Sequence, residues 1–253
     1  MRIRGAVLLL GAVALLLFAL PAVSKEKRKG AREIPDRFKR APYNSMSLSV
    51  GYPNDGFQVR AKRLRSSENL KVRSDCRKNS YGHPALVLML QRTAKDIAAA
   101  QPGSVMLVGD LSRERGGSLS GHRSHQTGRD ADVGFFVTDK EGHPLQSDRF
   151  YGFTGDGQSK DGSPVLFDDW RNWLLVKSWL LDTRAGISHI FIQRDLRARL
   201  LNFAAHHPKA KPYVAAAAAL LKQPEHGEDH SDHFHVRITC PALQAGLCYS
   251  ESH

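Results

Sequence analysis

Residues 121–136 read GHRSHQTGRDADVGFF, a polar loop that runs into an apolar stretch with the character of a β-strand. Side chains two positions apart in a strand lie on one face, so this reading places Asp130 and Asp132 together. His125 lies in the loop just before the strand, and Gly128 gives the chain freedom to turn. A loop histidine and a strand carboxylate at this spacing, His125 and Asp132, can converge on one metal ion.

The segment DHFHVR at 232–237 carries a second pair of candidate ligands. In a strand, His233 and His235 point to the same face and their imidazoles can reach a common point. Together with His125 and Asp132, one of these histidines would complete a set of two imidazoles and a carboxylate. Catalytic zinc sites use three ligands of these kinds and leave a fourth position for water. An HxH pair alone is weak evidence, because such pairs are common on exposed strands, and the combination of both segments is more specific.

Neighbouring polar residues allow two interpretations each. His122 could be an additional ligand or a substrate contact. Asp130 could orient a ligand imidazole through a hydrogen bond, or it could form a surface ion pair.

The rest of the chain alternates helix-like and strand-like segments without a regular βαβ rhythm, which favours the α+β class. We expect a small, mostly antiparallel sheet with flanking helices and a zinc site at the sheet face. Helices are predicted at 84–100, 167–182, 194–207 and 212–223, and strands within 46–64 and at 104–112, 130–137, 187–193 and 233–240. Residues 139–166 are rich in Gly, Asp and Ser and predict a long surface excursion.

The N-terminus has the pattern of a secretory signal peptide over residues 1–24. Two arginines precede an apolar run at 6–20, and small residues follow, with cleavage expected after Ser24. An uncleaved anchor helix is the alternative, although the run is shorter than the roughly 20 residues that span a bilayer. Residues 25–45 predict a basic, flexible linker before a single domain over 46–253 that carries the expected zinc site. The mature protein is therefore expected to be exported to the periplasm.

The formal net charge of +12 is concentrated toward the N-terminal part of the chain. Because export is expected and no nucleic-acid-binding motif is present, we exclude nucleic acid as a partner. Anionic envelope polymers or lipid head groups suit a basic tail better, and an envelope-anchoring partner is one interpretation of it. A solubilising linker is the other.

Three cysteines are present, and none has the spacing of a zinc finger. In an oxidising compartment Cys240 and Cys248 could close a small loop, which leaves Cys76 over to pair with a partner or stay reduced.

The motif order SHQTGRDADV followed by HSDHFHVRITCP resembles the penicillin-insensitive murein endopeptidases. These belong to the wider group of lysostaphin, D-Ala-D-Ala metallopeptidase and hedgehog-like zinc folds, which carry HxxxxxxD and HxH motifs. YGHPALVLMLQR and VMLVGDLS are also similar to that family and lie in the same order. The likeness runs from about residue 76 to 248, with little of it in the excursion at 139–166.

The resemblance implies a zinc enzyme that hydrolyses D-alanyl-diaminopimelate cross-links between the peptides of peptidoglycan. By motif position His125, Asp132 and His235 would be the zinc ligands, and His122 matches a histidine near the metal. His233 would act as the base, and His230 matches another active-site histidine. Of the cysteine pairings, only Cys240–Cys248 is carried over.

Two alternatives stay open. One is a D,D- or L,D-carboxypeptidase or an amidase on the same scaffold, and the other is a non-catalytic wall-binding protein. The presence of both complete motifs and of His233 argues against the second.

Overall fold

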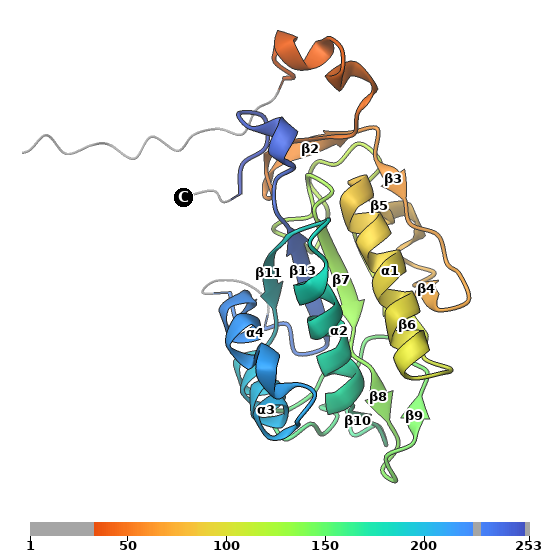
Figure 1. The fold of residues 1–253 in the computed structure, drawn as a ribbon. Coiled ribbons are helices and arrows are strands. Elements are labelled where there is room, and N and C mark those ends of the chain that lie inside the picture. The colour runs from red at the N-terminus through yellow and green to blue at the C-terminus, as the bar shows by residue number, and fades with distance from the viewer. Residues whose placement is uncertain (1–32, 225–228, 251–253) are drawn as a thin grey trace, which may run out of the picture.

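The computed structural model describes residues 33–224 and 229–250, and in this part of the chain a six-stranded sheet forms the centre of the molecule (Figure 1). Its strands follow the order β12-β11-β13-β7-β6-β4. The inner pairings are antiparallel, whereas β11–β12 and β4–β6 at the two edges are parallel. The strands are β4 (Leu70–Val72), β6 (Met106–Val108), β7 (Asp130–Gly134), β11 (Ile187–Phe191), β12 (Leu221–Lys222) and β13 (His233–Ile238).

Four α-helices pack beside this sheet, and α1 and α2 lie across one of its faces (Figure 1). They are α1 (Pro84–Ala100), α2 (Asp169–Leu181), α3 (Arg194–His206) and α4 (Val214–Leu220). Proline occupies the first turn of α1, where its missing N–H costs no hydrogen bond, and the His83 side chain accepts a hydrogen bond from Ala85 N. The expected α+β class is confirmed, with the sheet antiparallel at its centre.

The strands β7 and β13 have one apolar face, and it carries the core. Phe234 on β13 is fully buried, and its ring makes edge-to-face contacts with Trp179 of α2 and with Phe135 at centroid distances of 5.6 and 4.8 Å. Ala131 and Val133 of β7 belong to the same buried cluster. The alternation of side chains therefore directs the other face of these two strands away from the helices.

Smaller sheets surround the central one. A hairpin of β1 (Leu48–Tyr52) and β2 (Asp55–Val59) turns at Pro53 and Asn54. In the excursion, β9 (Pro144–Leu145) pairs with one side of β8 (Val137–Thr138), and β10 (Leu166–Phe167) pairs with the other side of β8. β3 (Lys62–Arg63) pairs with β5 (Tyr81–Gly82).

Part of the segment expected to be a flexible linker is folded. Two 3₁₀ helices, η1 (Asp36–Lys39) and η2 (Tyr43–Ser45), precede β1. Phe38 is buried in a small cluster with Leu48, Val50 and Leu247. Burial of its apolar ring stabilises this segment even though the neighbouring residues are largely basic. The predicted signal peptide and residues 25–32 lie outside the described residues, and in the described part no helix is long and apolar enough to cross a membrane.

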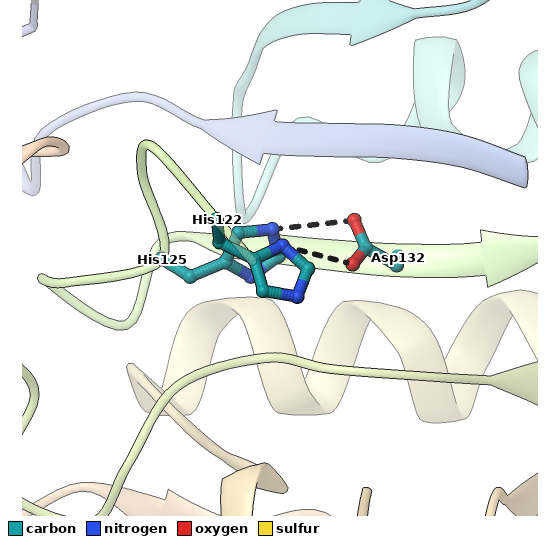
Figure 2. Close-up of side chains that lie close together, drawn as sticks. All are labelled: His122, His125 and Asp132. Carbon is teal, nitrogen blue, oxygen red and sulfur yellow. Dashed lines mark ion pairs between the residues drawn. The ribbon is translucent and has the colours of Figure 1, made fainter. Parts of the chain in front are cut away.

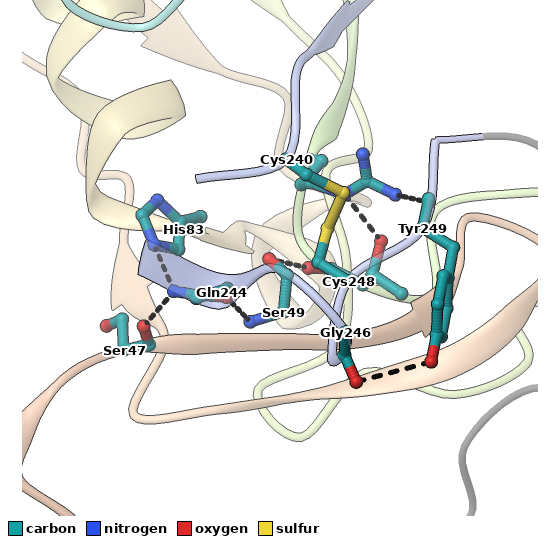
Figure 3. Close-up of a disulfide and its surroundings, with 10 residues drawn as sticks. Ser47, Ser49, His83, Cys240, Gln244, Gly246, Cys248 and Tyr249 are labelled. Atoms are coloured by element: carbon teal, nitrogen blue, oxygen red, sulfur yellow. Dashed lines mark hydrogen bonds between the residues drawn. A yellow bond between two sulfur atoms is a disulfide. The ribbon is translucent and has the colours of Figure 1, made fainter. Parts of the chain in front are cut away.

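The C-terminal loop is closed by a disulfide between Cys240 and Cys248, as the family resemblance implied (Figure 3). Between these cysteines Gln244 is fully buried and connects the loop to the first strand. Its Oε1 accepts a hydrogen bond from Ser49 N and its Nε2 donates to Ser47 O (Figure 3). Cys76 is a buried free thiol.

Candidate metal centre

Three predicted residues gather at the polar face of β7 (Figure 2). One ligand atom each from His122, His125 and Asp132 lies within 4.8 Å of the others. His125 Nε2 is 3.2 Å from Asp132 Oδ1, and His122 Nδ1 is 3.7 Å from Asp132 Oδ2. His125 is completely buried and His122 is half-buried, so the group lies at the edge of the interior.

The loop before β7 is held in a conformation that local preference disfavours. His125 has a positive φ of 67°, which a non-glycine residue adopts only when its surroundings enforce it. Its Nδ1 lies 2.5 Å from Leu111 O, which fixes the ring so that Nε2 faces Asp132. Gly128, with a φ of 72°, provides the turn that the sequence predicts.

The next residue along the loop, Gln126, attaches it to the β1–β2 hairpin. Its backbone N–H donates to Pro53 O, and its Nε2 donates to Asn54 O. Its Oε1 accepts a hydrogen bond from Gly56 N at 3.2 Å. The hairpin therefore buttresses the loop that carries both histidines.

The strand β13 brings its two histidines to the same carboxylate. In the antiparallel register His235 is opposite Asp132 and His233 is opposite Gly134. His233 Nε2 and His235 Nδ1 are each 3.4 Å from Asp132 Oδ1. Asp132 is thus surrounded by imidazoles from a loop and from a strand about a hundred residues further along the chain.

Each of three histidines also contacts a second carboxylate. His235 Nε2 lies 2.8 Å from Asp130 Oδ1, His122 Nε2 lies 3.1 Å from Asp110 Oδ2, and His233 Nδ1 lies 2.6 Å from Asp232 Oδ1. Such carboxylates fix the tautomer and orientation of a ligand imidazole. Of the two interpretations of Asp130, the structure favours the orienting one, because Asp130 is fully buried and also accepts a hydrogen bond from Arg237 Nε at 2.5 Å.

His230 lies beside the strand pair. Its ring centroid is 5.1 Å from that of His233 and 5.5 Å from that of His235. Among the described residues, the non-glycine residues with positive φ are Arg60, His125 and His230. Two of these three belong to this one site, which is where proteins concentrate backbone strain.

The buried carboxylates strongly favour positive charge here. Burial alone would lower the pKa of His233, but Asp132 and Asp232 outweigh burial and raise that pKa to about 10. Burial likewise opposes the rise in the pKa of His125, which Asp132 produces. For Asp132, burial would raise the pKa, and the surrounding imidazoles hold it well below its usual range. In the absence of a metal ion, protonated histidines supply this positive charge.

Two unsatisfied atoms show that a metal cation fits the site. His125 Nε2 and Asp132 Oδ1 are buried and have no hydrogen-bond partner within 33–224 and 229–250, although they face each other. With Nδ1 carrying the proton toward Leu111 O, Nε2 presents a lone pair to a carboxylate oxygen. Two facing acceptors need a positive charge between or beside them, which a bound metal ion would supply in place of the protons. Imidazole and carboxylate donors in this number suit zinc.

Comparison with known proteins supports the resemblance that the sequence motifs indicate. The family model of the penicillin-insensitive murein endopeptidases matches residues 49–159. A penicillin-insensitive murein endopeptidase from Haemophilus influenzae is 29% identical over 244 residues, which cover 93% of this chain and 77% of that protein. One from Escherichia coli K12 is 27% identical over 207 residues, 79% of this chain and 69% of that protein. This chain is therefore similar to the penicillin-insensitive murein endopeptidases over most of its length.

The family match is wider at its N-terminal side than the sequence resemblance suggested. It begins at residue 49 rather than near residue 76, and it includes most of the excursion at 139–166. Both regions contact the site: the β1–β2 hairpin through Gln126, and the excursion through Phe150, whose ring stacks on His233.

The fold brings together all six predicted site residues: His122, His125, Asp132, His230, His233 and His235. Their individual roles stay predictions. Sequence reasoning missed Asp110, Asp232 and Phe150. Asp110 follows closely on the buried strand β6 and Asp232 directly precedes the HxH pair, so both had a local signal, whereas Phe150 had none.

Proposed function

We propose that this protein is an exported, zinc-dependent murein endopeptidase that hydrolyses D-alanyl-diaminopimelate cross-links in peptidoglycan. The observation that carries the proposal is the pair of facing, buried acceptor atoms on His125 and Asp132, surrounded by the histidines of β13. The relatives named above are penicillin-insensitive murein endopeptidases, and the stretch that the family model matches includes His122, His125 and Asp132.

The metal would be held by His125, Asp132 and His235, with His122 as a further candidate ligand. His235 would use Nδ1, since its Nε2 faces Asp130. When bound, zinc supplies a Lewis acid that polarises a carbonyl group and lowers the pKa of water to about 7. Asp130 and Asp110 hold the imidazoles of His235 and His122 in the orientation that this binding requires.

Proton transfer is assigned to His233. Its Nδ1 is held by Asp232, which leaves Nε2 directed toward Asp132, where the reacting groups would meet. A base oriented by a carboxylate in this way accepts a proton from the attacking water and returns it to the departing amine. His230 lies against the His233 ring and would contact the substrate or the developing charge.

The direct test is mass spectrometry of purified cross-linked muropeptide dimers after incubation with the mature protein. We expect dimers to be converted to monomers, and a chelator or the variant His233→Ala to prevent this. His143→Ala is the matched control, because His143 is an exposed histidine paired with Asp139 outside the site. Metal analysis of the same samples should find zinc in the active protein.

Other products would change the assignment. Intact dimers with free D-alanine would indicate a carboxypeptidase, and cleavage between glycan and peptide would indicate an amidase. Intact dimers with no release of any product, in a folded and zinc-loaded sample, would favour a wall-binding protein.

We further propose that the basic residues 25–32, KEKRKGAR, help to hold the enzyme at the anionic cell wall. Deleting only these residues keeps Phe38 and its cluster intact. The shortened protein should cleave soluble dimers normally but bind isolated sacculi more weakly at low salt, where charges are least screened. Equal binding of both proteins to sacculi would contradict this role.

A further inference from the structure

An aromatic residue from the excursion lies against the proposed base. The ring of Phe150 stacks on the imidazole of His233, with centroids 5.3 Å apart and planes inclined by 25°. Phe150 is half-buried and lies in the stretch of chain between β9 and β10. Nothing in the motifs that define the metal centre requires an aromatic residue at this position.

The sheet is shaped to admit this ring. A Cβ on Gly134, the residue opposite His233, would come within 2.7 Å of the Phe150 ring. A Cβ on Gly109 would come within 2.8 Å of the same ring. Neither glycine has a positive φ, so neither is required by its backbone conformation. Both are needed because the aromatic ring approaches the sheet so closely.

The Phe150 ring is itself held in place. The guanidinium carbon of Arg73 lies 4.7 Å from the ring centroid, a cation–π contact. Arg73 is fixed in turn by two contacts to Asp75, at 2.6 and 3.2 Å, and by its backbone hydrogen bond to Val108 O. The Phe150 ring therefore lies between the guanidinium group of Arg73, the glycines of the sheet and the imidazole of His233.

We propose that Phe150 is a positioning residue that sets the plane of the His233 imidazole. The contacts of His233 with Asp232 and Asp132 lie at the edges of its ring and leave tilting of the ring plane unrestrained. A stacked ring removes that freedom and excludes water from one face of the imidazole. The catalytic consequence rests on the proposed function of His233 as the base, whereas the orientation itself does not.

The stacking that this proposal requires can be measured without activity. In proton NMR of the purified protein, a ring stacked on His233 shields the carbon-bound protons of that imidazole, whose signals the variant His233→Gln identifies. We expect these signals to move downfield in Phe150→Ala and to stay in place in Tyr151→Leu, which changes the neighbouring ring that faces Arg149. Unchanged His233 signals in Phe150→Ala would overturn the proposal.

Kinetics on muropeptide dimers test the consequence. We expect Phe150→Ala to lower kcat about 10- to 100-fold with little change in KM or zinc content, because a small misplacement of a reacting group has this cost. Phe150→Tyr keeps the ring and should restore most of kcat. A loss of zinc in Phe150→Ala, or a change in KM alone, would overturn the positioning role.

A double-mutant cycle guards against a simple loss of folding. Gly109→Ala should lower kcat because its methyl group displaces the Phe150 ring, and the same change should have little further effect in Phe150→Ala. Additive effects would overturn the proposal. If the unmodified protein leaves dimers intact while the His233 signals respond as expected, the proposed function fails and the stacking of Phe150 on His233 stands.

Discussion

The two faces of the β7–β13 pair are almost equally buried and have opposite chemistry. Ala131, Val133, Phe234 and Val236 on one face are fully buried against the helices. Asp130, Asp132, His233 and His235 on the other face are between 0 and 8% exposed. Burial alone therefore does not distinguish a core from a functional site. The distinction comes from what each side chain contacts.

Burying side chains has opposite effects on the free energy of folding at the two faces. A fully buried large apolar side chain stabilises the fold by about 1.5 to 3 kcal/mol. A buried carboxylate is costly unless charges of opposite sign surround it. We therefore expect the apolar face to determine stability and the polar face to determine metal binding and activity. Substitutions on the two faces should separate these properties.

The largest effect on activity is expected for Asp132→Ala, which removes the carboxylate that all the surrounding histidines share. Several kcal/mol of transition-state stabilisation would be lost, so kcat/KM should fall at least about 1000-fold, with loss of bound zinc. The metal-free variant should also lose some stability at neutral pH, because Asp132 stabilises the protonated forms of His125 and His233. Urea unfolding with metal analysis checks this. Retained zinc or unchanged activity in this variant would contradict the assignment of metal binding to the polar face.

The opposite result is expected for Phe234→Ala on the apolar face. Removing a ring that packs on Trp179 and Phe135 should lower the free energy of unfolding by about 3 to 5 kcal/mol. Folded molecules of this variant should still bind zinc, because Phe234 points away from the metal centre. Chemical denaturation followed by tryptophan fluorescence gives the free energy. Loss of zinc from the folded variant would show that the faces are not independent.

Asp130 and Asp168 are both buried carboxylates that pair with an arginine, and only Asp130 lies on the polar face. Asp130 contacts His235 and Arg237 at the polar face, whereas Asp168 contacts Arg171 at the start of α2. Asp130→Asn should weaken zinc binding about 10- to 100-fold, because the partner that orients His235 loses its charge. Asp168→Asn should leave zinc affinity unchanged. Competition with a zinc chelator measures both affinities, and equal losses would argue that Asp130 has only a structural role.

The sequence predicts those features of the site that depend on local geometry. A strand has a period of two, so the sequence alone assigns Asp130 and Asp132 to one face, and likewise His233 and His235. The long helix α1 is equally predictable, because Leu86 and Leu90 recur at helical spacing and are both fully buried.

Features that depend on distant contacts are not predictable in this way. The folding of residues 33–45 depends on Phe38 meeting Leu247 at the other end of the chain. Phe150 reaches His233 only because Gly109 and Gly134, on other segments, leave room for its ring. No local sequence pattern encodes such contacts between segments that are distant in the chain.

The smallest effect is expected for an ion pair between the helices α1 and α2, which should influence the stability of the protein but not its zinc content. Asp182 ends α2, accepts hydrogen bonds from the backbone N–H groups of Arg184 and Ala185, and pairs with Arg92 of α1 at 2.6 Å. Burial would raise the pKa of Asp182, but these contacts outweigh it and lower that pKa. A carboxyl group with a lowered pKa stabilises the fold above its unfolded pKa of about 3.9, and the contribution is lost as the pH falls through the folded pKa.

Asp182→Asn should therefore reduce the free energy of unfolding by about 1 kcal/mol at neutral pH, and the difference should shrink below about pH 4. Asp36→Asn is the control, because its pair with Lys39 is exposed to solvent and should not contribute measurably. Thermal unfolding across this pH range, together with zinc analysis, tests both variants. A difference for Asp182→Asn that persists in acid would show that its hydrogen-bonding geometry, rather than its charge, stabilises the junction of α1 and α2. A change in zinc content would show that charges on the helix side also reach the metal centre.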